Sequence, residues 1–118
     1  GIKGHPIYVN GDGTPYRSYL YAADLAIWLW TILCQGKDCY PYNVGSEQEI
    51  TIAGLANMVA DSFQPRPEVQ IAEKAIPNKI PERYVPSTQR AFLELNLQQN
   101  IGLKESIERT VLWHKNSI

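Results

Sequence analysis

Residues 11–24 read Gly-Asp-Gly-Thr-Pro-Tyr-Arg-Ser-Tyr-Leu-Tyr-Ala-Ala-Asp. The stretch combines a turn built from glycine and aspartate, an arginine (Arg17), an aromatic run, and a carboxylate (Asp24) at the start of an apolar segment. A second arginine, Arg83, stands well downstream, before another segment that we expect to be helical. Guanidinium groups are planar, permanently charged forks that suit phosphate oxygens. The two arginines could therefore converge on a diphosphate.

Short apolar runs predict the strands around this stretch. Ile7–Val9 and Tyr19–Tyr21 flank the turn, and we expect them to pair as a hairpin with Arg17 just before the return strand. Tyr42–Ser46 is predicted to be a strand that ends in a turn, and Val69–Ile71 a short strand. Residues 75–82 contain two prolines and are expected to form a loop.

Apolar spacing and capping residues predict four helices. The first spans residues 22–35 and ends before Gly36. Thr51 is expected to cap a second helix, and Ser87 a third that ends at Asn96. The last helix covers about residues 104–115 and carries a Glu105/Arg109 pair at i, i+4.

The helix over residues 22–35 is apolar on every side. Between Leu25 and Cys34, Thr31 is the single polar residue. The run is shorter than the roughly 20 residues that a transmembrane helix needs, so we expect no membrane span. A helix that is apolar all round must be buried on more than one side. Four short helices and a few strands could hardly surround it, which predicts a partner layer outside this sequence.

Composition limits the classes of function. With 118 residues the chain is one domain at most, and 11 basic against 12 acidic residues give a net charge of −1. There is no basic excess for nucleic acid and no polybasic run for a membrane surface. Cys34 and Cys39 could form a disulfide or half a metal site. We interpret them as reduced thiols of a cytoplasmic protein and predict no metal. Because residue 1 is glycine, we expect an excised piece of a longer protein.

Taken together, these motifs resemble the C-terminal part of the NAD-dependent sugar-nucleotide epimerases and dehydratases, the extended short-chain dehydrogenase/reductase family, and in particular dTDP-glucose 4,6-dehydratase. The family has the same turn, arginine, aromatic strand and aspartate as residues 11–24, and a Tyr-Asn-Val/Ile-Gly motif present here as Tyr42–Gly45. Arg83-Tyr84 matches the dehydratases, although Ser87 stands where aspartate is usual and Arg90 replaces lysine. The end of the last helix, at residues 110–113, also matches the usual ending of the family's sequences.

The resemblance implies an α/β (mixed α+β) fold in which residues 1–118 form a small substrate-binding lobe, with the N-terminal Rossmann domain outside the sequence. It also implies a site: Arg17 and Arg83 bind the diphosphate of a dTDP- or UDP-linked hexose, Asn43 faces that diphosphate, and Tyr8 and Asn10 line the base pocket. The parent enzyme could be a homodimer.

The cofactor and the catalytic groups are implied to lie elsewhere. The Gly11–Pro15 turn lacks the third glycine of a dinucleotide fingerprint, and no Tyr-x-x-x-Lys pair occurs. By resemblance the parent enzyme uses NAD or NADP to oxidise a hexose carbon and later returns the hydride, so we expect no catalytic residue here. Arg83-Tyr84 and Asn43 favour dehydration slightly over epimerisation. Two other hypotheses stay open: a self-standing module that binds a nucleotide or a protein, and an oligomerisation domain that uses the helix at residues 25–34.

Overall fold

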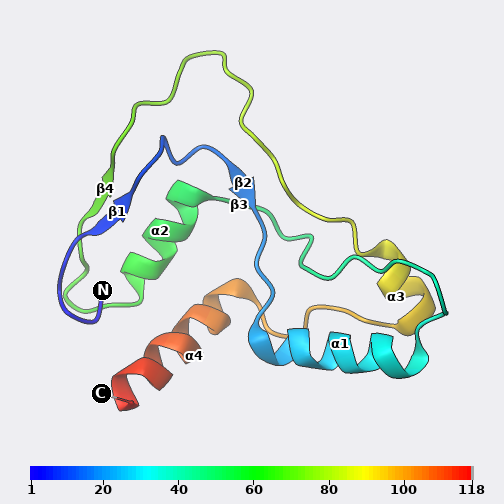
Figure 1. Cartoon of the computed structure of the whole chain (residues 1–118). Helices are drawn as coiled ribbons and strands as arrows, with labels where there is room; N and C mark the ends of the chain where they lie inside the picture. Colours follow the sequence, from blue (N-terminus) through cyan, green and yellow to red (C-terminus); the bar gives the residue numbers. More distant parts are fainter. Residues whose placement is uncertain (118) are drawn as a thin grey trace.

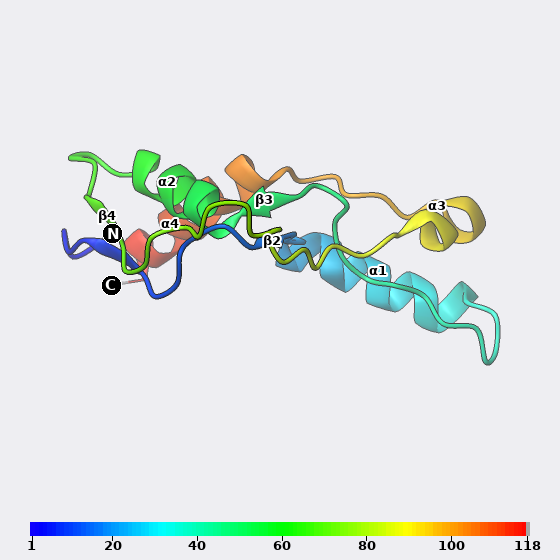
Figure 2. The same cartoon turned by 90° about the horizontal axis from the view of Figure 1, so that it is seen from above.

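The computed structural model describes residues 1–117, which form a thin body of 47 × 43 × 17 Å. Its elements occur in the order β1, β2, α1, β3, α2, β4, α3 and α4. Figure 1 shows α2 beside β1 and β4 at one end, with α1 and α3 at the other. The view of Figure 2, turned by 90°, shows that the molecule is thin in this direction. A body this thin has little interior in which to bury apolar side chains.

The strands form two separate two-stranded sheets. β1 (Ile7–Val9) pairs in parallel with β4 (Val69–Ile71), whereas β2 (Tyr16–Arg17) pairs antiparallel with β3 (Ile50–Thr51). The prediction of a hairpin between residues 7–9 and 19–21 was therefore wrong, although the strand at residues 69–71 is confirmed. The turn does not reverse the chain onto β1, because the carbonyls of Gly13 and Pro15 instead accept hydrogen bonds from the first residues of α2.

The predicted α1 (Ala22–Gln35) is confirmed at both ends. On the buried side of α1, Trp28 is 1% exposed and packs with Ala91 and Leu97. The indole N–H of Trp28 donates to the carbonyl oxygen of Gln98 at 3.2 Å. This cluster joins α1 to α3 (Gln89–Leu95) and forms the core at that end of the molecule.

Thr51 caps α2 (Ile52–Asp61) as predicted: its Oγ1 accepts from the backbone N–H of Gly54 at 3.0 Å. The backbone N–H groups of Ile52 and Ala53 donate to Pro15 and Gly13 at 3.0 and 2.9 Å. The N-terminal donors of α2 are thus used by the chain itself. The buried residues of α2 are Ala56 and Ala60.

The start of α3 differs from the prediction, and its end does not. Ser87 does not cap it; the helix follows Thr88, whose backbone N–H donates to a carboxylate oxygen of Glu47 at 2.7 Å. Long-range contacts fix this entry to the helix: besides the bond from Thr88 to Glu47, the carbonyl of Ser87 accepts from the side-chain amide of Asn43 at 2.9 Å. Asn96 ends α3 with a left-handed φ of 52°, as predicted.

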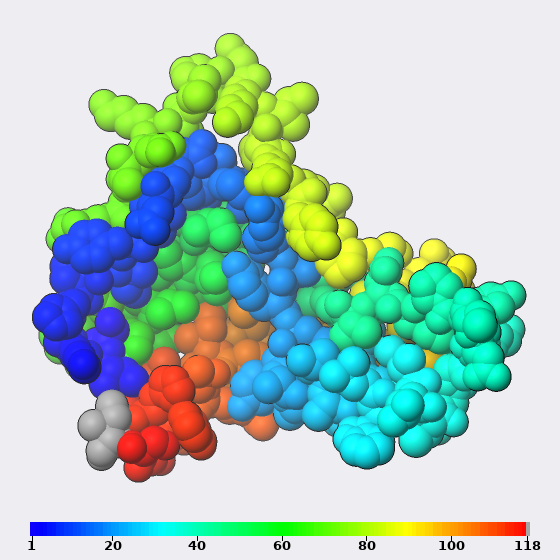
Figure 3. Space-filling model, viewed as in Figure 1, coloured from blue at the N-terminus to red at the C-terminus, as the bar shows by residue number. Residues whose placement is uncertain are grey.

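The last helix, α4 (Leu103–Asn116), begins and ends within a residue of its predicted bounds. Its Glu105–Arg109 ion pair is present at 2.6 Å, and both side chains are about half exposed. Figure 1 shows α4 and α1 following one another along the same side of the molecule. The loop predicted over residues 75–82 is present and begins earlier, at residue 72; it projects from the body in the space-filling view of Figure 3.

Of two expectations for the α1 end of the molecule, one is wrong and the other is confirmed. The strand predicted over residues 42–46 is not formed, because this segment has no ladder partner within residues 1–117. The expected shortage of cover for α1 is confirmed: Trp30 is 67% exposed and Leu33 75% exposed. Trp113 is also largely exposed, so of the three tryptophans only Trp28 packs in the interior.

Candidate functional site

The centre of the site is a small patch of backbone where three segments lie side by side. Tyr16 of β2 is flanked by the loop at residues 82–84: its N–H donates to the carbonyl of Glu82 at 2.8 Å, and its carbonyl accepts from the N–H of Tyr84 at 3.1 Å. Arg83 is thereby opposed to Tyr16 in a parallel bridge. On its other side β2 pairs with β3. The fold thus brings the segments of the two predicted arginines into direct contact.

The same register sends the two guanidinium groups to opposite faces of the patch. Opposed residues in a bridge share a face, and successive residues alternate. Arg83 therefore shares the face of Tyr16, whereas Arg17 leaves from the other. The ion pairs agree with this geometry: Nη2 of Arg17 is 3.0 Å from Oε2 of Glu82, and Nε of Arg83 contacts Oε2 of Glu49. The two arginines flank the patch from its two faces.

The carboxylate partners of both arginines are open to solvent. The side chains of Arg17 and Glu82 are 31% and 72% exposed, and those of Arg83 and Glu49 are 61% and 43% exposed. Exposed ion pairs contribute about 0–1 kcal/mol, because water and salt screen them. A phosphate can therefore replace either glutamate at small cost. The sequence did not predict Glu82 and Glu49 as partners of the arginines, because a local pattern does not indicate contacts between residues that are far apart in the chain.

We call the backbone around Tyr16, Arg17 and Arg83 the arginine patch. A hollow of about 490 Å³ lies next to it in the chain, between α2 on one side and β1 with its following loop on the other. One wall is residues 7–13, and the other is the apolar face of α2, formed by Ile52, Leu55, Ala56 and Val59. Pro15 also lines it, two positions before Arg17 in the chain. Tyr8, which is 66% exposed, and Asn10, also exposed, are both among the lining residues.

The loop that lines this hollow is held in shape by Asp12. Its Oδ1 accepts from the backbone N–H of Thr14 at 3.0 Å and from the Thr14 hydroxyl at 2.8 Å. These bonds, the backbone one first, hold the pKa of Asp12 below its ordinary value. Gly13 follows with a φ of +74°, and a Cβ there would lie 2.8 Å from the Cβ of Ala53. Only glycine combines this backbone conformation with so close an approach to α2.

Asn43, the remaining predicted site residue, contacts the chain four residues after Arg83. Its Nδ2 donates to the carbonyl oxygen of Ser87 at 2.9 Å. Among the described residues it makes no hydrogen bond to either arginine. The structure therefore places the five predicted residues in three neighbouring groups: Tyr8 and Asn10 at the hollow, the two arginines at the patch, and Asn43 beside Ser87.

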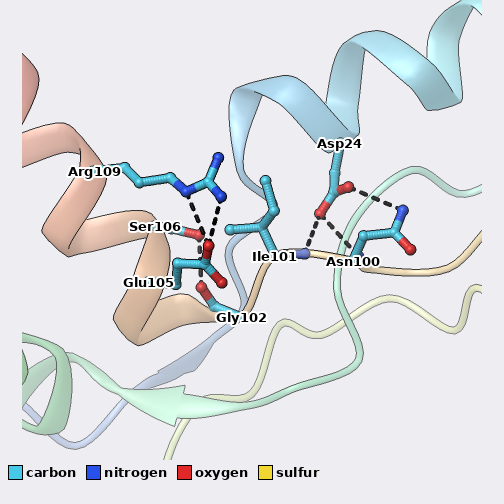
Figure 4. Close-up of polar contacts among 7 residues, drawn as sticks. All are labelled: Asp24, Asn100, Ile101, Gly102, Glu105, Ser106 and Arg109. Atoms are coloured by element: carbon cyan, nitrogen blue, oxygen red, sulfur yellow. Dashed lines mark hydrogen bonds and ion pairs between the residues drawn. The ribbon is translucent and has the colours of Figure 1, made fainter.

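Asp24 has a larger part in the structure than its position at the start of a helix predicts. It is 1% exposed, and its carboxylate accepts from the backbone N–H and the side-chain amide of Asn100 at 3.0 and 3.2 Å, and from the N–H of Ile101 at 2.9 Å. Figure 4 shows these bonds tying the start of α1 to the segment that enters α4. Both oxygens of the carboxylate accept hydrogen bonds from this segment, which is in keeping with a structural rather than a catalytic role.

Other kinds of site find little support. Residues 1–117 contain no cluster of three or more His, Cys, Asp or Glu side chains that could hold a metal ion, and Cys34 and Cys39 are free and exposed. No helix in the same range is long and apolar enough to cross a membrane. The junction of β3 with α2 does not fit a dinucleotide pyrophosphate, because Gly13, Pro15 and Thr51 already occupy its N–H groups.

The fold is shared with solved chains of larger proteins. The match covers nearly all of this chain and about a third of each of theirs. UDP-glucose 4-epimerase from Thermotoga maritima, solved with UDP-glucose, superposes with a TM-score of 0.83 at 17% identity, over 98% of this chain and 37% of the epimerase. dTDP-glucose 4,6-dehydratase from Bacillus anthracis, solved with NAD, gives a TM-score of 0.79 at 18% identity, over 98% of this chain and 36% of the dehydratase.

The chain is also similar in sequence to several characterised enzymes. UDP-glucuronic acid decarboxylase 1 of Arabidopsis thaliana is 30% identical over 117 residues, which are 99% of this chain and 26% of the decarboxylase. A trifunctional UDP-glucose 4,6-dehydratase, epimerase and reductase of the same plant is 29% identical over 96% of this chain and 17% of its own length. No family model matches the chain. The chain is therefore homologous to a portion of the sugar-nucleotide epimerases, dehydratases and decarboxylases, and spans about a quarter or less of these plant relatives.

Proposed function

We propose that this chain is the substrate-binding portion of an NAD(P)-dependent enzyme that acts on a UDP- or dTDP-linked hexose. One observation carries the proposal: in a chain that resembles nucleotide-sugar enzymes along its length, an arginine follows directly on the loop that lines a ligand-sized hollow. The hollow of about 490 Å³ lies within the range of about 300–1,000 Å³ that is typical of small-molecule sites.

In this proposal the base enters the hollow and the diphosphate lies at the arginine patch. The apolar face of α2 supplies contact area, and Tyr8 and Asn10 contact the base from the β1 side. Arg17 exchanges Glu82 for a phosphate oxygen, which forms a charge-assisted hydrogen bond. Arg83 leaves from the opposite face, so we assign it a second phosphate contact that depends on the loop at residues 82–84 folding around the ligand.

The chain's contribution to the reaction is binding and orientation. Holding the sugar nucleotide in one geometry removes translational and rotational freedom before the chemical step. Because the N–H groups at the start of α2 are already used and the sequence has neither a dinucleotide fingerprint nor a Tyr-x-x-x-Lys pair, we assign the cofactor and the groups that move protons to polypeptide outside these residues. Arg83-Tyr84 and Asn43 favour a 4,6-dehydratase, whereas the relatives also include a decarboxylase and an epimerase.

The kinetics of the full-length gene product test this role. Arg17→Ala removes a charge-assisted contact of about 1.5–3 kcal/mol, which corresponds to a roughly 10- to 150-fold higher KM for the sugar nucleotide. The value of kcat should change little, because the contact is made equally in the ground and transition states. UDP-glucose, UDP-glucuronic acid and dTDP-glucose are the substrates to compare.

Arg66→Ala is the matched control. Arg66 also forms a solvent-accessible ion pair, with Asp61 at 2.6 Å, but it follows α2 in the chain, whereas Arg17 follows the lining residue Pro15 by two positions. Its variant should keep the wild-type KM. An unchanged KM in Arg17→Ala, or an equal rise in both variants, would contradict the assignment of Arg17 to the diphosphate.

A further inference from the structure

The guanidinium group of Arg17 is held at two points. Its Nη1 donates to the carbonyl oxygen of Tyr16 at 2.8 Å, and its Nη2 donates to Oε2 of Glu82 at 3.0 Å. The Tyr16 carbonyl is itself fixed, because it also accepts from the backbone N–H of Tyr84 at 3.1 Å. The anchor at Tyr16 does not involve the side chain of Glu82. Loss of that carboxylate should therefore leave the guanidinium in place, with Nη2 open to another acceptor.

Arg83 has no second anchor of this kind. In residues 1–117 its side chain makes one hydrogen bond, from Nε to a carboxylate oxygen of Glu49. The side chain is 61% exposed, against 31% for Arg17. Removing Glu49 would open Arg83 to a ligand but would also release it from its position, so two opposing effects would mix. At Arg17 the glutamate contributes its charge without being needed to hold the arginine.

Glu82 combines a fixed backbone with a free side chain. Its carbonyl oxygen accepts from the N–H of Tyr16 at 2.8 Å, whereas its side chain is 72% exposed. The carboxylate can therefore turn into solvent, but it cannot leave the neighbourhood of Arg17. An anion that takes Nη2 must break this ion pair and then stay near the displaced negative charge. Both effects oppose the binding of an anion.

We propose that Glu82 is an internal competitor, which occupies Nη2 of Arg17 in the empty site and lowers the affinity of the site for a nucleoside diphosphate. The inference rests on the proposed function, because it takes a phosphate at Arg17 as its starting point. It goes further by giving Glu82 a negative effect on binding rather than a supporting one. A weaker ground-state contact does not slow the chemical step and lets the ligand leave sooner.

Isothermal titration of UDP into the full-length gene product, at one fixed ionic strength, tests this role. Glu82→Gln keeps the size of the side chain and removes its charge. It should lower the Kd for UDP by about two- to tenfold, through the loss of a screened ion pair and of a like charge near the phosphate. If Glu82 instead served to orient Arg17, the same variant would bind UDP more weakly. An unchanged or higher Kd would overturn the proposal.

Asp61→Asn is the matched control. It removes the carboxylate partner of another solvent-accessible arginine, Arg66, and changes the net charge of the chain by the same amount as Glu82→Gln. Both carboxylates are largely exposed, at 65% for Asp61 and 72% for Glu82, so neither variant should disturb folding. The control should keep the wild-type Kd. Equal tightening in both variants would assign the effect to net charge and would overturn competition at Arg17.

The Arg17→Ala protein separates the two proposals. In that background Glu82→Gln should lower the Kd by a smaller factor than in the wild type, because there is no guanidinium to compete for. Equal factors in the two backgrounds would overturn the competitor role. If the proposed function fails, UDP binds equally well to the wild type and to Arg17→Ala. If only the present inference fails, the affinity depends on Arg17 and is not improved by Glu82→Gln.

Discussion

Replacing the buried carboxylate of Asp24 is expected to destabilise the chain severely. Asp24→Ala removes an acceptor of three hydrogen bonds of 2.9–3.2 Å and leaves the backbone N–H groups of Asn100 and Ile101 without their partner. A hydrogen bond to a charged group contributes about 1.5–3 kcal/mol, and such contributions are not additive within one cluster. We therefore expect a loss of about 3–5 kcal/mol, against a total of about 5–15 kcal/mol for a typical domain.

Urea unfolding followed by tryptophan fluorescence measures this loss, because Trp28 is buried in the core that α1 forms. With a slope of about 1–3 kcal/mol per molar urea, the midpoint should fall by about 2 M. Asp24→Asn keeps the shape but loses the charge, so it should fall between wild type and Asp24→Ala. Asp38→Ala, at an exposed aspartate just after the same helix, is the control and should stay within about 0.5 kcal/mol of wild type. A midpoint for Asp24→Ala equal to that of the control would refute the tie between α1 and α4.

Two further predictions concern the loop and helix that form the hollow. Thr51→Ala removes the oxygen that accepts from the N–H of Gly54 and should lower the free energy of unfolding by about 1 kcal/mol, which the same urea assay would detect; Thr51→Ser should restore it. The pKa of Asp12 is lowered by its bonds to Thr14, so its contribution to stability is complete above its ordinary pKa and is lost as the pH falls through the lowered one. Between pH 6 and 3 the wild type should therefore lose stability more steeply than Asp12→Asn, and parallel curves would show that these bonds do not stabilise the loop.

Local patterns predicted most of the helices. α1, the Thr51 cap, the end of α3 at Asn96 and the Glu105–Arg109 pair each depend on residues within a few positions of one another, and each is present. The strands depend on distant partners. β1 pairs with β4 rather than with residues 19–21, and residues 42–46 pair with no strand among the described residues. A local sequence pattern does not show which distant segments come together, because that depends on the closure of long loops.

The same division holds for the candidate site. Tyr8, Asn10 and Arg17 could be proposed from the sequence because they lie within one short stretch that matches a known motif. That Arg83 would oppose Tyr16, and so send its side chain to the face opposite Arg17, depends on the register of a bridge between distant segments. The use of Asp24 as a tie to Asn100 and Ile101 was equally out of reach, because nothing near Asp24 in the sequence indicates that partner.

The central claim is that a nucleoside diphosphate binds between the hollow and Arg17. Titrating UDP into the full-length gene product, with backbone amide and arginine side-chain NMR signals as the readout, tests it most directly. We expect shifts at residues 8–13 and at the guanidinium of Arg17, and their loss in Arg17→Ala but not in Arg66→Ala. Saturable UDP binding that leaves residues 8–13 and Arg17 unshifted would contradict it.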